Sequence, residues 1–178
     1  MRKLYTVAFP RFGAQDAAFV EGFRAEHDAR SHALIDAHLT LVFGCDAVPE
    51  PAYLAHVQQV AERTAPIAFR CRYAMLGADG EAERAYVFLV PDEGHAALSL
   101  LHDRLYTGPL AEHLRLDLPY TPHITIASSI DRRHSKGLCD TLNATGLDIH
   151  ATVDALSVGS IEGERFTVIT ELSLRGRA

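Results

Sequence analysis

The sequence predicts a mixed fold of helices and strands that is built from two similar halves. YTVAFP at residues 5–10 matches YVFLVP at residues 86–91, since each has an aromatic residue, an apolar strand and a final proline. Each stretch is followed by a helical pattern and then by an apolar strand that contains the motif His-x-Thr. The two tyrosines are 81 residues apart and the two motif histidines 85 residues apart. The second copy therefore needs about four additional residues, which a loop insertion supplies.

Hydrophobic periodicity predicts the individual elements. Helices are expected at residues 14–30, 53–63 and 94–108, with a short helix after Asp131. Strands are expected at residues 3–9, 38–43, 67–76, 84–90, 118–128, 147–156, 156–161 and 165–174. The strands at 67–76 and 84–90 are separated by GADGEAE, a sequence typical of a hairpin turn.

No low-complexity linker divides the chain, so residues 1–178 are expected to form a single domain. We expect the first His-x-Thr half to span about residues 1–65 and the second about residues 84–130. Strands within 66–83 and 147–175 then complete the sheets. A pseudo-twofold relation between the halves brings the two motif strands face to face.

The two motifs place a histidine and a threonine two positions apart inside apolar runs. The residues are His38 and Thr40 in HLTLVF, and His123 and Thr125 in HITIAS. Alternate side chains of a strand point to opposite faces, so each histidine shares a face with its threonine. The aliphatic residues between them bury into the core and fix the register. The same alternation predicts that Val42 lies on the face of the first motif and Phe43 on the buried face.

Chance does not account for the pair of motifs. A His-x-Thr flanked on both sides by Leu, Ile, Val or Phe is expected about 0.05 times in a chain of this composition, yet two copies are present. A third, looser copy begins at His150, but it has alanine in the middle position and no counterpart in the first half. We interpret this copy as a coincidence on a strand face. Taken singly, each motif histidine also fits a structural role, bonded to neighbouring backbone.

Two imidazoles and two hydroxyls in one cleft suit the chemistry of a phosphate ester. An imidazole with a pKa of about 6.5 takes either protonation state near neutral pH, so the pair supplies one base and one acid. The base activates the nucleophile and the acid protonates the leaving oxygen. Each threonine hydroxyl donates a hydrogen bond to an anionic oxygen. This chemistry requires neither a metal nor a cofactor.

The bulk composition limits the class of partner. A formal charge of −6 disfavours a partner that is held along an extended basic face, so a small nucleotide or an RNA end fits better than a long nucleic acid. Three cysteines far apart in the sequence argue against a disulfide framework and a thiolate zinc site. No apolar run reaches the length of a membrane span and no targeting segment is evident. We expect a cytoplasmic protein without a membrane partner, and a monomer by default.

HLTL and HITI, with a proline directly before the second histidine, resemble the paired signature of the 2H phosphoesterase superfamily. The similarity is greatest to its 2′-5′ RNA ligase-like or 2′,3′-cyclic phosphodiesterase branch, and it covers essentially the whole chain. The resemblance implies a bilobal α+β fold, in which two antiparallel β-sheets line a central cleft and the helices lie outside. It also implies hydrolysis of a 2′,3′-cyclic phosphate or 2′,5′ linkage on a nucleotide or RNA end, with reverse 2′-5′ ligation as a further activity.

Carried over residue by residue, the resemblance assigns catalysis to His38, Thr40, His123 and Thr125. It implies that His38 protonates the leaving oxygen and that His123 activates water, whereas the residues alone leave this order open. The chain departs from the family at the two residues before the first motif, which are Asp and Ala where many relatives have a proline. This departure affects the expected edge of the cleft rather than the chemistry.

Three further residues are weaker candidates for substrate binding. Tyr120 precedes the second motif and could reach the phosphate or stack on a base, although packing on Pro122 is the alternative. Phe9 and Arg11 lie at the end of the first strand, where a base and a phosphate oxygen could be contacted; a core and a surface role are the alternatives. The basic run DRRHSK at 131–136 is typical of a solvated helix start, with a nucleic-acid contact as the alternative.

Two other functions compete with catalysis by paired histidines. A non-catalytic module that holds a nucleotide or an RNA end would use the same cleft, although binding alone has little need for two proton-transfer groups. A metal-dependent phosphohydrolase would use His-Asp pairs, which occur at residues 27–28 and 102–103. Each pair lies in a helical stretch without the additional spaced ligands of a two-metal site, so we expect no metal site.

Overall fold

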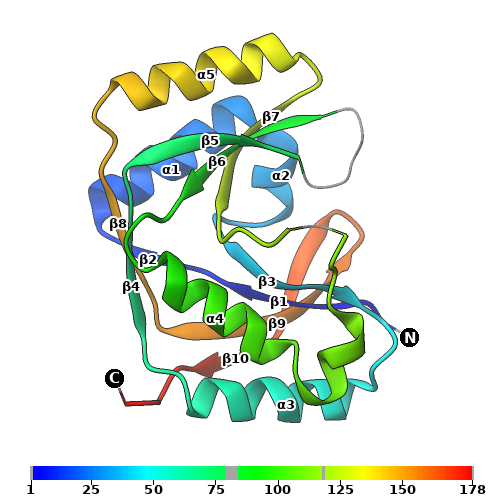
Figure 1. Cartoon of the computed structure of the whole chain (residues 1–178). Helices are drawn as coiled ribbons and strands as arrows, with labels where there is room; N and C mark the ends of the chain where they lie inside the picture. The colour runs from blue at the N-terminus through cyan, green and yellow to red at the C-terminus, as the bar shows by residue number, and fades with distance from the viewer. Residues whose placement is uncertain (1, 79–83, 118, 178) are drawn as a thin grey trace.

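The structure, a computed structural model, describes residues 2–78, 84–117 and 119–177, and contains three antiparallel sheets (Figure 1). The four-stranded sheet has the order β10 (Arg165–Ser173), β9 (Ala155–Glu162), β1 (Leu4–Ala8) and β3 (Leu39–Cys45). One three-stranded sheet has the order β5 (Tyr73–Gly77), β6 (Ala85–Val90) and β7 (Ile124–Ser129). The other has the order β2 (Arg11–Phe12), β8 (Ile149–Val153) and β4 (Ile67–Cys71).

The helices lie on the outside of the sheets (Figure 1). They are α1 (Ala14–His27), α2 (Ala29–Leu34), α3 (Glu50–Glu62), α4 (His95–Leu105), the 3-10 helix η1 (Gly108–His113) and α5 (Arg132–Ala144). The predicted α+β class with antiparallel sheets is therefore confirmed. Within the described part of the chain, no helix is both long enough and apolar enough to cross a membrane.

Three sequence expectations need correction. The segment 67–76 is not one strand, because β4 ends at Cys71, β5 begins at Tyr73, and the two belong to different sheets. This division creates a third sheet where two were expected. The helix after Asp131 has 13 residues rather than being short, and Asp131 caps it by accepting from the backbone N–H groups of Arg133 and His134. The expected hairpin partners, β5 and β6, do pair, while residues 79–83 of its turn lie outside the described residues.

The two motif strands pair with their neighbours in equivalent registers. Val7 lies opposite Thr40 in the first half, and Phe88 lies opposite Thr125 in the second. The neighbouring pairs follow the same rule. Adding 81 to the residue number on the partner strand and 85 to the number on the motif strand converts each of these pairs of the first half into a pair of the second. These registers support the interpretation that the chain consists of two half-repeats, which stays a prediction.

Each half packs its helix against the motif strand of the other half. Helix α1, which precedes β3 in the chain, packs against β7, while α4, which precedes β7, packs against β3 and β4. Helix α3 covers β9 and β10, and α5 covers the sheet of β5, β6 and β7 (Figure 1). One apolar core contains side chains from both halves, including Leu39 and Leu41 of β3 and Ile124 and Ile126 of β7. Burial of these residues couples the folding of the two halves.

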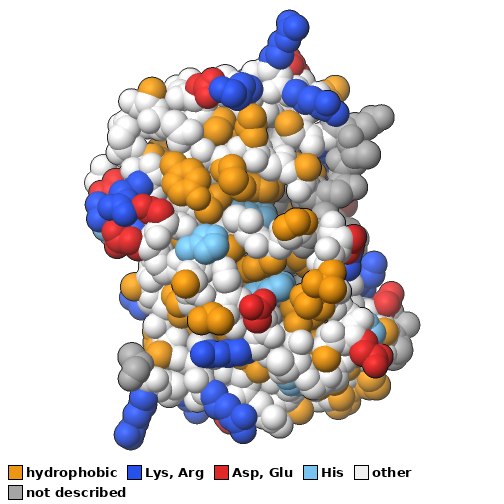
Figure 2. All heavy atoms as spheres, in the orientation of Figure 1, with side chains coloured by type: hydrophobic (Ala, Val, Ile, Leu, Met, Phe, Trp, Pro, Cys, Tyr) orange, Lys and Arg blue, Asp and Glu red, His pale blue; other side chains and the backbone are white. Residues whose placement is uncertain are grey.

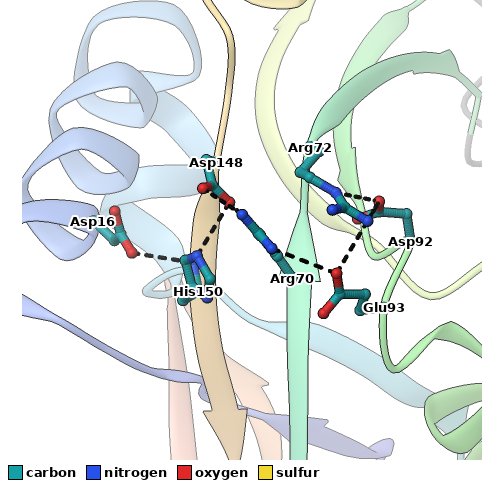
Figure 3. A network of polar contacts seen from close by, with 7 residues as sticks. All are labelled: Asp16, Arg70, Arg72, Asp92, Glu93, Asp148 and His150. Atoms are coloured by element: carbon teal, nitrogen blue, oxygen red, sulfur yellow. Dashed lines mark hydrogen bonds and ion pairs between the residues drawn. The ribbon is translucent and has the colours of Figure 1, made fainter.

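A network of charged side chains joins the sheet of β2, β8 and β4 to the segments beside it (Figure 3). Arg70 of β4 donates to both carboxylate oxygens of Asp148, at 2.5 and 2.6 Å. His150 of β8 contacts the same carboxylate at 3.1 Å, and its backbone N–H donates to Asp16 of α1 at 3.0 Å. Arg72 extends the network to Asp92 and Glu93 before α4. These groups are largely exposed, so each pair contributes little to stability, and the network acts mainly on the relative position of the elements.

Two glycines allow aromatic rings to lie directly on the sheets. Gly77 of β5 lies opposite Tyr86, and Gly159 of β9 lies opposite Tyr5, which is 81 residues before Tyr86. A Cβ atom on Gly77 would lie 1.9 Å from the ring of Phe88, and one on Gly159 would lie 2.5 Å from the ring of Phe166. Neither position therefore accepts a side chain without displacing the ring above it.

Gly77→Ala is expected to destabilise the protein by about 1–3 kcal/mol, because the added methyl group overpacks the buried ring of Phe88. Gly137→Ala is the matched control, since this residue lies inside α5 with no atom within 4 Å of an added Cβ. The control is expected to raise the free energy of unfolding by about 0.5–1 kcal/mol. Urea denaturation measures both changes, and equal effects of the two substitutions would contradict this account of Gly77.

Candidate active site

The two motifs line one cleft of about 570 Å³ between the four-stranded sheet and the β5–β6–β7 sheet. All four motif residues, His38, Thr40, His123 and Thr125, are half-buried and lie on its wall. The histidines stand directly before β3 and β7, at the start of each strand. The aliphatic residues between and after them are fully buried, so they anchor each strand to the core and turn the polar residues toward the cleft.

A β-bulge interrupts the alternation of each motif strand at the same place. Between the pairs Val7–Thr40 and Thr6–Val42 the partner strand advances one residue while β3 advances two. The predicted faces of Val42 and Phe43 are therefore wrong: Val42 is buried and Phe43 lines the cleft. A bulge adds one residue to a strand and exchanges the faces of everything after it.

The second motif strand has the corresponding bulge. Between Phe88–Thr125 and Val87–Ala127, β6 advances one residue and β7 advances two. Ala127 is consequently buried, and Ser128 lines the cleft. Phe43 and Ser128 each follow their motif histidine by five residues. Each motif strand thus presents three side chains to the cleft, at positions zero, two and five from the histidine.

Both imidazoles are fixed by the same hydrogen bond. Nδ1 of His38 lies 2.9 Å from the backbone oxygen of Asp36, and Nδ1 of His123 lies 2.6 Å from that of Thr121. A carbonyl oxygen only accepts, so Nδ1 donates in each case. A neutral imidazole of this tautomer has its basic lone pair on Nε2. The two rings are therefore prepared in the same way for proton transfer at Nε2.

Aromatic neighbours restrict the rings unequally. Phe88 stacks on His123 with ring centroids 3.8 Å apart, whereas Phe9 meets His38 edge-on at 6.4 Å. Burial lowers the pKa of His38 to about 4, with smaller contributions in the same direction from the charges of Arg24 and His123. The hydrogen bond to Asp36 partly opposes this shift. In the ligand-free cleft His38 is consequently neutral near pH 7.

An ion pair between a buried arginine and a partly exposed glutamate on α1 holds the loop before the first motif. Arg24 is 1% exposed and pairs with Glu21 at 2.9 Å. Arg24 also donates to the carbonyl of Ile35 at 2.6 Å, and Glu21 accepts from the backbone N–H of Ala37 at 2.8 Å. The two side chains thereby fix the peptide whose carbonyl accepts from the first motif imidazole.

The sequence of this chain identifies its relatives. A sequence model of the 2′-5′ RNA ligase superfamily matches residues 12–165. The chain belongs to this superfamily. Among curated proteins, none matches it.

Several solved structures have the same fold as this chain and match it over nearly their whole length. TT0787 from Thermus thermophilus is 20% identical, with a TM-score of 0.62, 99% of this chain and 100% of that chain covered. Escherichia coli LigT in complex with NADP+ is 17% identical, with a TM-score of 0.59 and 98% of each chain covered. Usb1 from Kluyveromyces marxianus is 10% identical, with a TM-score of 0.59 and 97% and 98% covered. LigT has also been solved in complexes with ATP, 3′-AMP and phosphate.

The three weaker candidates for substrate binding, Tyr120, Phe9 and Arg11, lie in different parts of the structure. Tyr120 lines the cleft, but its hydroxyl donates to the backbone oxygen of Thr40 at 3.2 Å and its ring stacks on His102 at 3.6 Å. Tyr120 thus braces the first motif strand from the second half. Phe9 lies edge-on to the ring of His38, with centroids 6.4 Å apart, but does not line the cleft wall itself. Arg11 is not brought into the cleft, since it pairs with Asp154 at 2.8 Å on the exposed surface.

The remaining sequence features lie away from the cleft wall. His150 is exposed and belongs to the network of Figure 3. The run at 131–136 begins helix α5, where Lys136 pairs with Asp140. Figure 2 shows hydrophobic and histidine side chains across the middle of this face, with most of the charged side chains around its margin. Within the described ranges, no group of three or more His, Cys, Asp or Glu side chains is placed to hold a metal ion.

Sequence reasoning missed several side chains of the cleft wall. They include Arg24, Asp28, Arg30, Phe43, Arg84, Phe88, Ser128 and Phe166. Aligning HLTLVF with HITIAS would have marked Phe43 and Ser128 as equivalent, but only the bulges turn them to the cleft. The charged residues come from helix ends and a turn, where no sequence motif indicates a site.

Arg24→Met is expected to lower the stability by about 2–4 kcal/mol, because Glu21 loses its ion-pair partner and the carbonyl of Ile35 loses its donor. It also removes a positive charge that disfavours the protonated imidazole, so the pKa of His38 should rise toward its ordinary value. NMR titration of the imidazole measures this shift. Arg133→Met, on the exposed first turn of α5, is the control and should leave the pKa unchanged. An unchanged pKa in Arg24→Met would contradict the role given to the ion pair.

Proposed function

We propose that this protein is a metal-independent phosphodiesterase that opens a 2′,3′-cyclic phosphate or a 2′,5′ linkage on a nucleotide or RNA end. The observation that supports this most is the equivalent placement of two imidazoles, each fixed through Nδ1 to a backbone carbonyl, on opposite walls of one cleft. Membership of the 2′-5′ RNA ligase superfamily supports the same reaction class. The nucleotide and phosphate complexes of LigT, a protein of the same fold, support the ligand class.

In the proposed reaction the phosphate lies between the two histidines. One neutral imidazole takes a proton from water, whose oxygen forms a new bond to phosphorus. The protonated imidazole gives its proton to the ribose oxygen that leaves, so that the cyclic diester becomes a monoester. The hydroxyls of Thr40 and Thr125 donate to the non-bridging oxygens, where negative charge increases. After release of the product, solvent restores the two protonation states.

The protonation state of each imidazole decides which histidine acts as the base and which as the acid. The low pKa of His38 in the ligand-free cleft favours His38 as the base, the reverse of the order that the family resemblance implies. A bound phosphate anion acts in the opposite direction, because it stabilises a protonated imidazole. Because both rings donate from Nδ1 to a backbone carbonyl and have the same tautomer, the cleft accommodates either order. The pH dependence of catalysis distinguishes them.

His38→Ala and His123→Ala are each expected to lower kcat by roughly 10²- to 10⁴-fold, since losing either partner removes half of the acid/base pair. The substrates are the four nucleoside 2′,3′-cyclic phosphates and a short RNA with a cyclic phosphate end, assayed in EDTA. His150→Ala, an exposed histidine outside the cleft, should keep full activity. Activity lost in EDTA and restored by a divalent metal would contradict the metal-free reaction. Nucleotide binding without product from the wild type would favour a non-catalytic binding module.

As the pH is lowered, kcat/KM is expected to begin to fall near pH 4 rather than near pH 6.5. A lowered pKa means that His38 gains its proton only when the pH falls to about 4, so the base form persists through the mildly acidic range. The measurement is kcat/KM from pH 3.5 to 9 for a cyclic nucleotide, with circular dichroism to confirm folding at each pH. An acidic limb that stays near pH 6.5 would contradict the assignment of His38 as the base.

A further inference from the structure

The first motif strand lies at the edge of its sheet and is irregular where it lines the cleft. In the order β10, β9, β1 and β3, β3 is the last strand, so its outer side has no strand neighbour among the described residues. Its register with β1 shifts immediately before and immediately after the pair Thr6–Val42. Bulges and edges leave backbone groups without a partner in the sheet, and such groups need another partner where water is excluded. The stretch 40–43 therefore depends on contacts from outside the sheet.

Two phenol hydroxyls supply such contacts. The hydroxyl of Tyr120 donates to the backbone oxygen of Thr40 at 3.2 Å, and the hydroxyl of Tyr106 accepts from the backbone N–H of Phe43 at 3.1 Å. Tyr106 is buried and Tyr120 is half-buried. Burial raises the pKa of both hydroxyls, so both keep their protons throughout the neutral range. The two bonds hold β3 at the two ends of its irregular stretch.

The two phenol rings meet at one buried imidazole. The ring of His102 on α4 stacks on Tyr120 with centroids 3.6 Å apart and an interplanar angle of 11°, and its centroid lies 4.8 Å from that of Tyr106. Its Nδ1 lies 3.1 Å from the carboxylate of Asp103, to which it donates. Burial lowers the pKa of His102 although Asp103 opposes the shift, so the ring is neutral near pH 7. His102 does not line the cleft, and its contacts serve to hold the two tyrosines.

The hydrogen bond of Tyr120 connects the two motifs directly. Tyr120 stands three residues before His123, and Thr40 stands two residues after His38. Each imidazole is bonded to a carbonyl two residues away in its own half, which fixes the orientation of the ring but not the separation of the halves. The bond between Tyr120 and Thr40 passes from one half to the other, so it acts on that separation.

The first half cannot make the reciprocal bond. Helices α1 and α4 begin 81 residues apart, so Glu21 and His102 occupy equivalent positions. Each supports the residues before the motif of its own half, Glu21 by accepting from the N–H of Ala37 and His102 by stacking on Tyr120. Ile35, like Tyr120, lies three residues before its motif histidine, but its aliphatic side chain has no hydroxyl. The bond across the cleft is thus made by the second half alone.

We propose that Tyr120 is a positioning residue whose hydroxyl sets the separation of the two motifs, and that Tyr106 and His102 support it. The inference rests on the proposed function, since it concerns the alignment of two imidazoles on one phosphate. Proton transfer on both sides of a phosphate needs both rings in place at once, and a displacement of about 1 Å can lower a rate by about 100-fold. Binding of the ligand by either half tolerates such a displacement. Loss of the hydroxyl should therefore lower kcat more than it raises KM.

Tyr120→Phe keeps the ring on His102 and removes only the hydroxyl. It is expected to lower kcat for a nucleoside 2′,3′-cyclic phosphate roughly tenfold or more, with KM within about twofold of the wild-type value. Tyr53→Phe is the matched control, because it also removes a phenol hydroxyl from a hydrogen bond, to Oγ1 of Thr6 at 2.8 Å, but lies outside the cleft wall. This control should keep the wild-type kcat. His102→Ala should lower kcat as Tyr120→Phe does, and His102→Phe, which restores a ring for stacking, should recover most of the loss.

Thermal unfolding confirms that each variant is folded at the assay temperature. A kcat of Tyr120→Phe within about twofold of the wild-type value would overturn the proposal, as would an equal fall in Tyr53→Phe or a change confined to KM.

Amide hydrogen exchange tests the bond across the cleft without turnover. The N–H of Phe43 is expected to exchange faster in Tyr106→Phe and in Tyr120→Phe than in Tyr53→Phe, because the first two changes release β3 locally. Equal exchange in Tyr120→Phe and Tyr53→Phe would overturn the role of Tyr120. A wild type that turns over no cyclic phosphate would refute the proposed function, and the exchange rates would then still decide whether Tyr120 holds the first motif strand.

Discussion

The burial of one face of each motif strand is the constraint on which the site depends. Leu39 and Leu41 on β3, and Ile124 and Ile126 on β7, are fully excluded from solvent. A slip of one residue in either strand would expose these side chains and bury the histidine and threonine, so the register is strongly fixed. The bulge after each threonine then turns one more residue to the cleft without disturbing the first two. Core packing therefore determines the positions of the reactive groups.

The same burial sets the electrostatics of the cleft. An imidazole that is partly withdrawn from water resists protonation unless a neighbour compensates. Each Nδ1 is satisfied by a backbone oxygen, so the proton on that nitrogen is fixed and exchange takes place at Nε2. Arg24, which is buried, and Glu21, which is partly exposed, together hold the loop of the first motif. The position and the pKa of His38 thus depend on side chains of α1 as well as on the motif strand itself.

The sequence predicted the parts of the structure that local patterns encode. The motif strands, the helices α1, α3 and α4 and the convergence of the two motifs follow from periodicity and internal similarity, whereas the division between β4 and β5 and the length of α5 do not. The faces of Val42 and Phe43 were wrong, because a bulge depends on pairing with a neighbouring strand and leaves no signal in one strand. Arg11 pairs with Asp154, a residue 143 positions away, and no local pattern indicates such a contact. For the same reason Phe166 could not be associated with the cleft.

The similarity of the two halves and the differences between them have different consequences for the cleft. Equivalent histidines with equivalent support are suited to proton transfer in both directions, since each ring can serve as acid or base. A ligand bound between them would have two equivalent orientations if the halves were identical. The halves differ, because the fifth residue after the histidine is Phe43 in one half and Ser128 in the other. The ring over the paired glycine is the half-buried Phe166 in one half and the buried Phe88 in the other. Because the helices α1 and α4 each pack on the opposite motif strand, the two halves share one core and line one cleft. The repeated motifs therefore supply two similar imidazoles, and divergence of the surrounding residues makes the two sides of that cleft unlike.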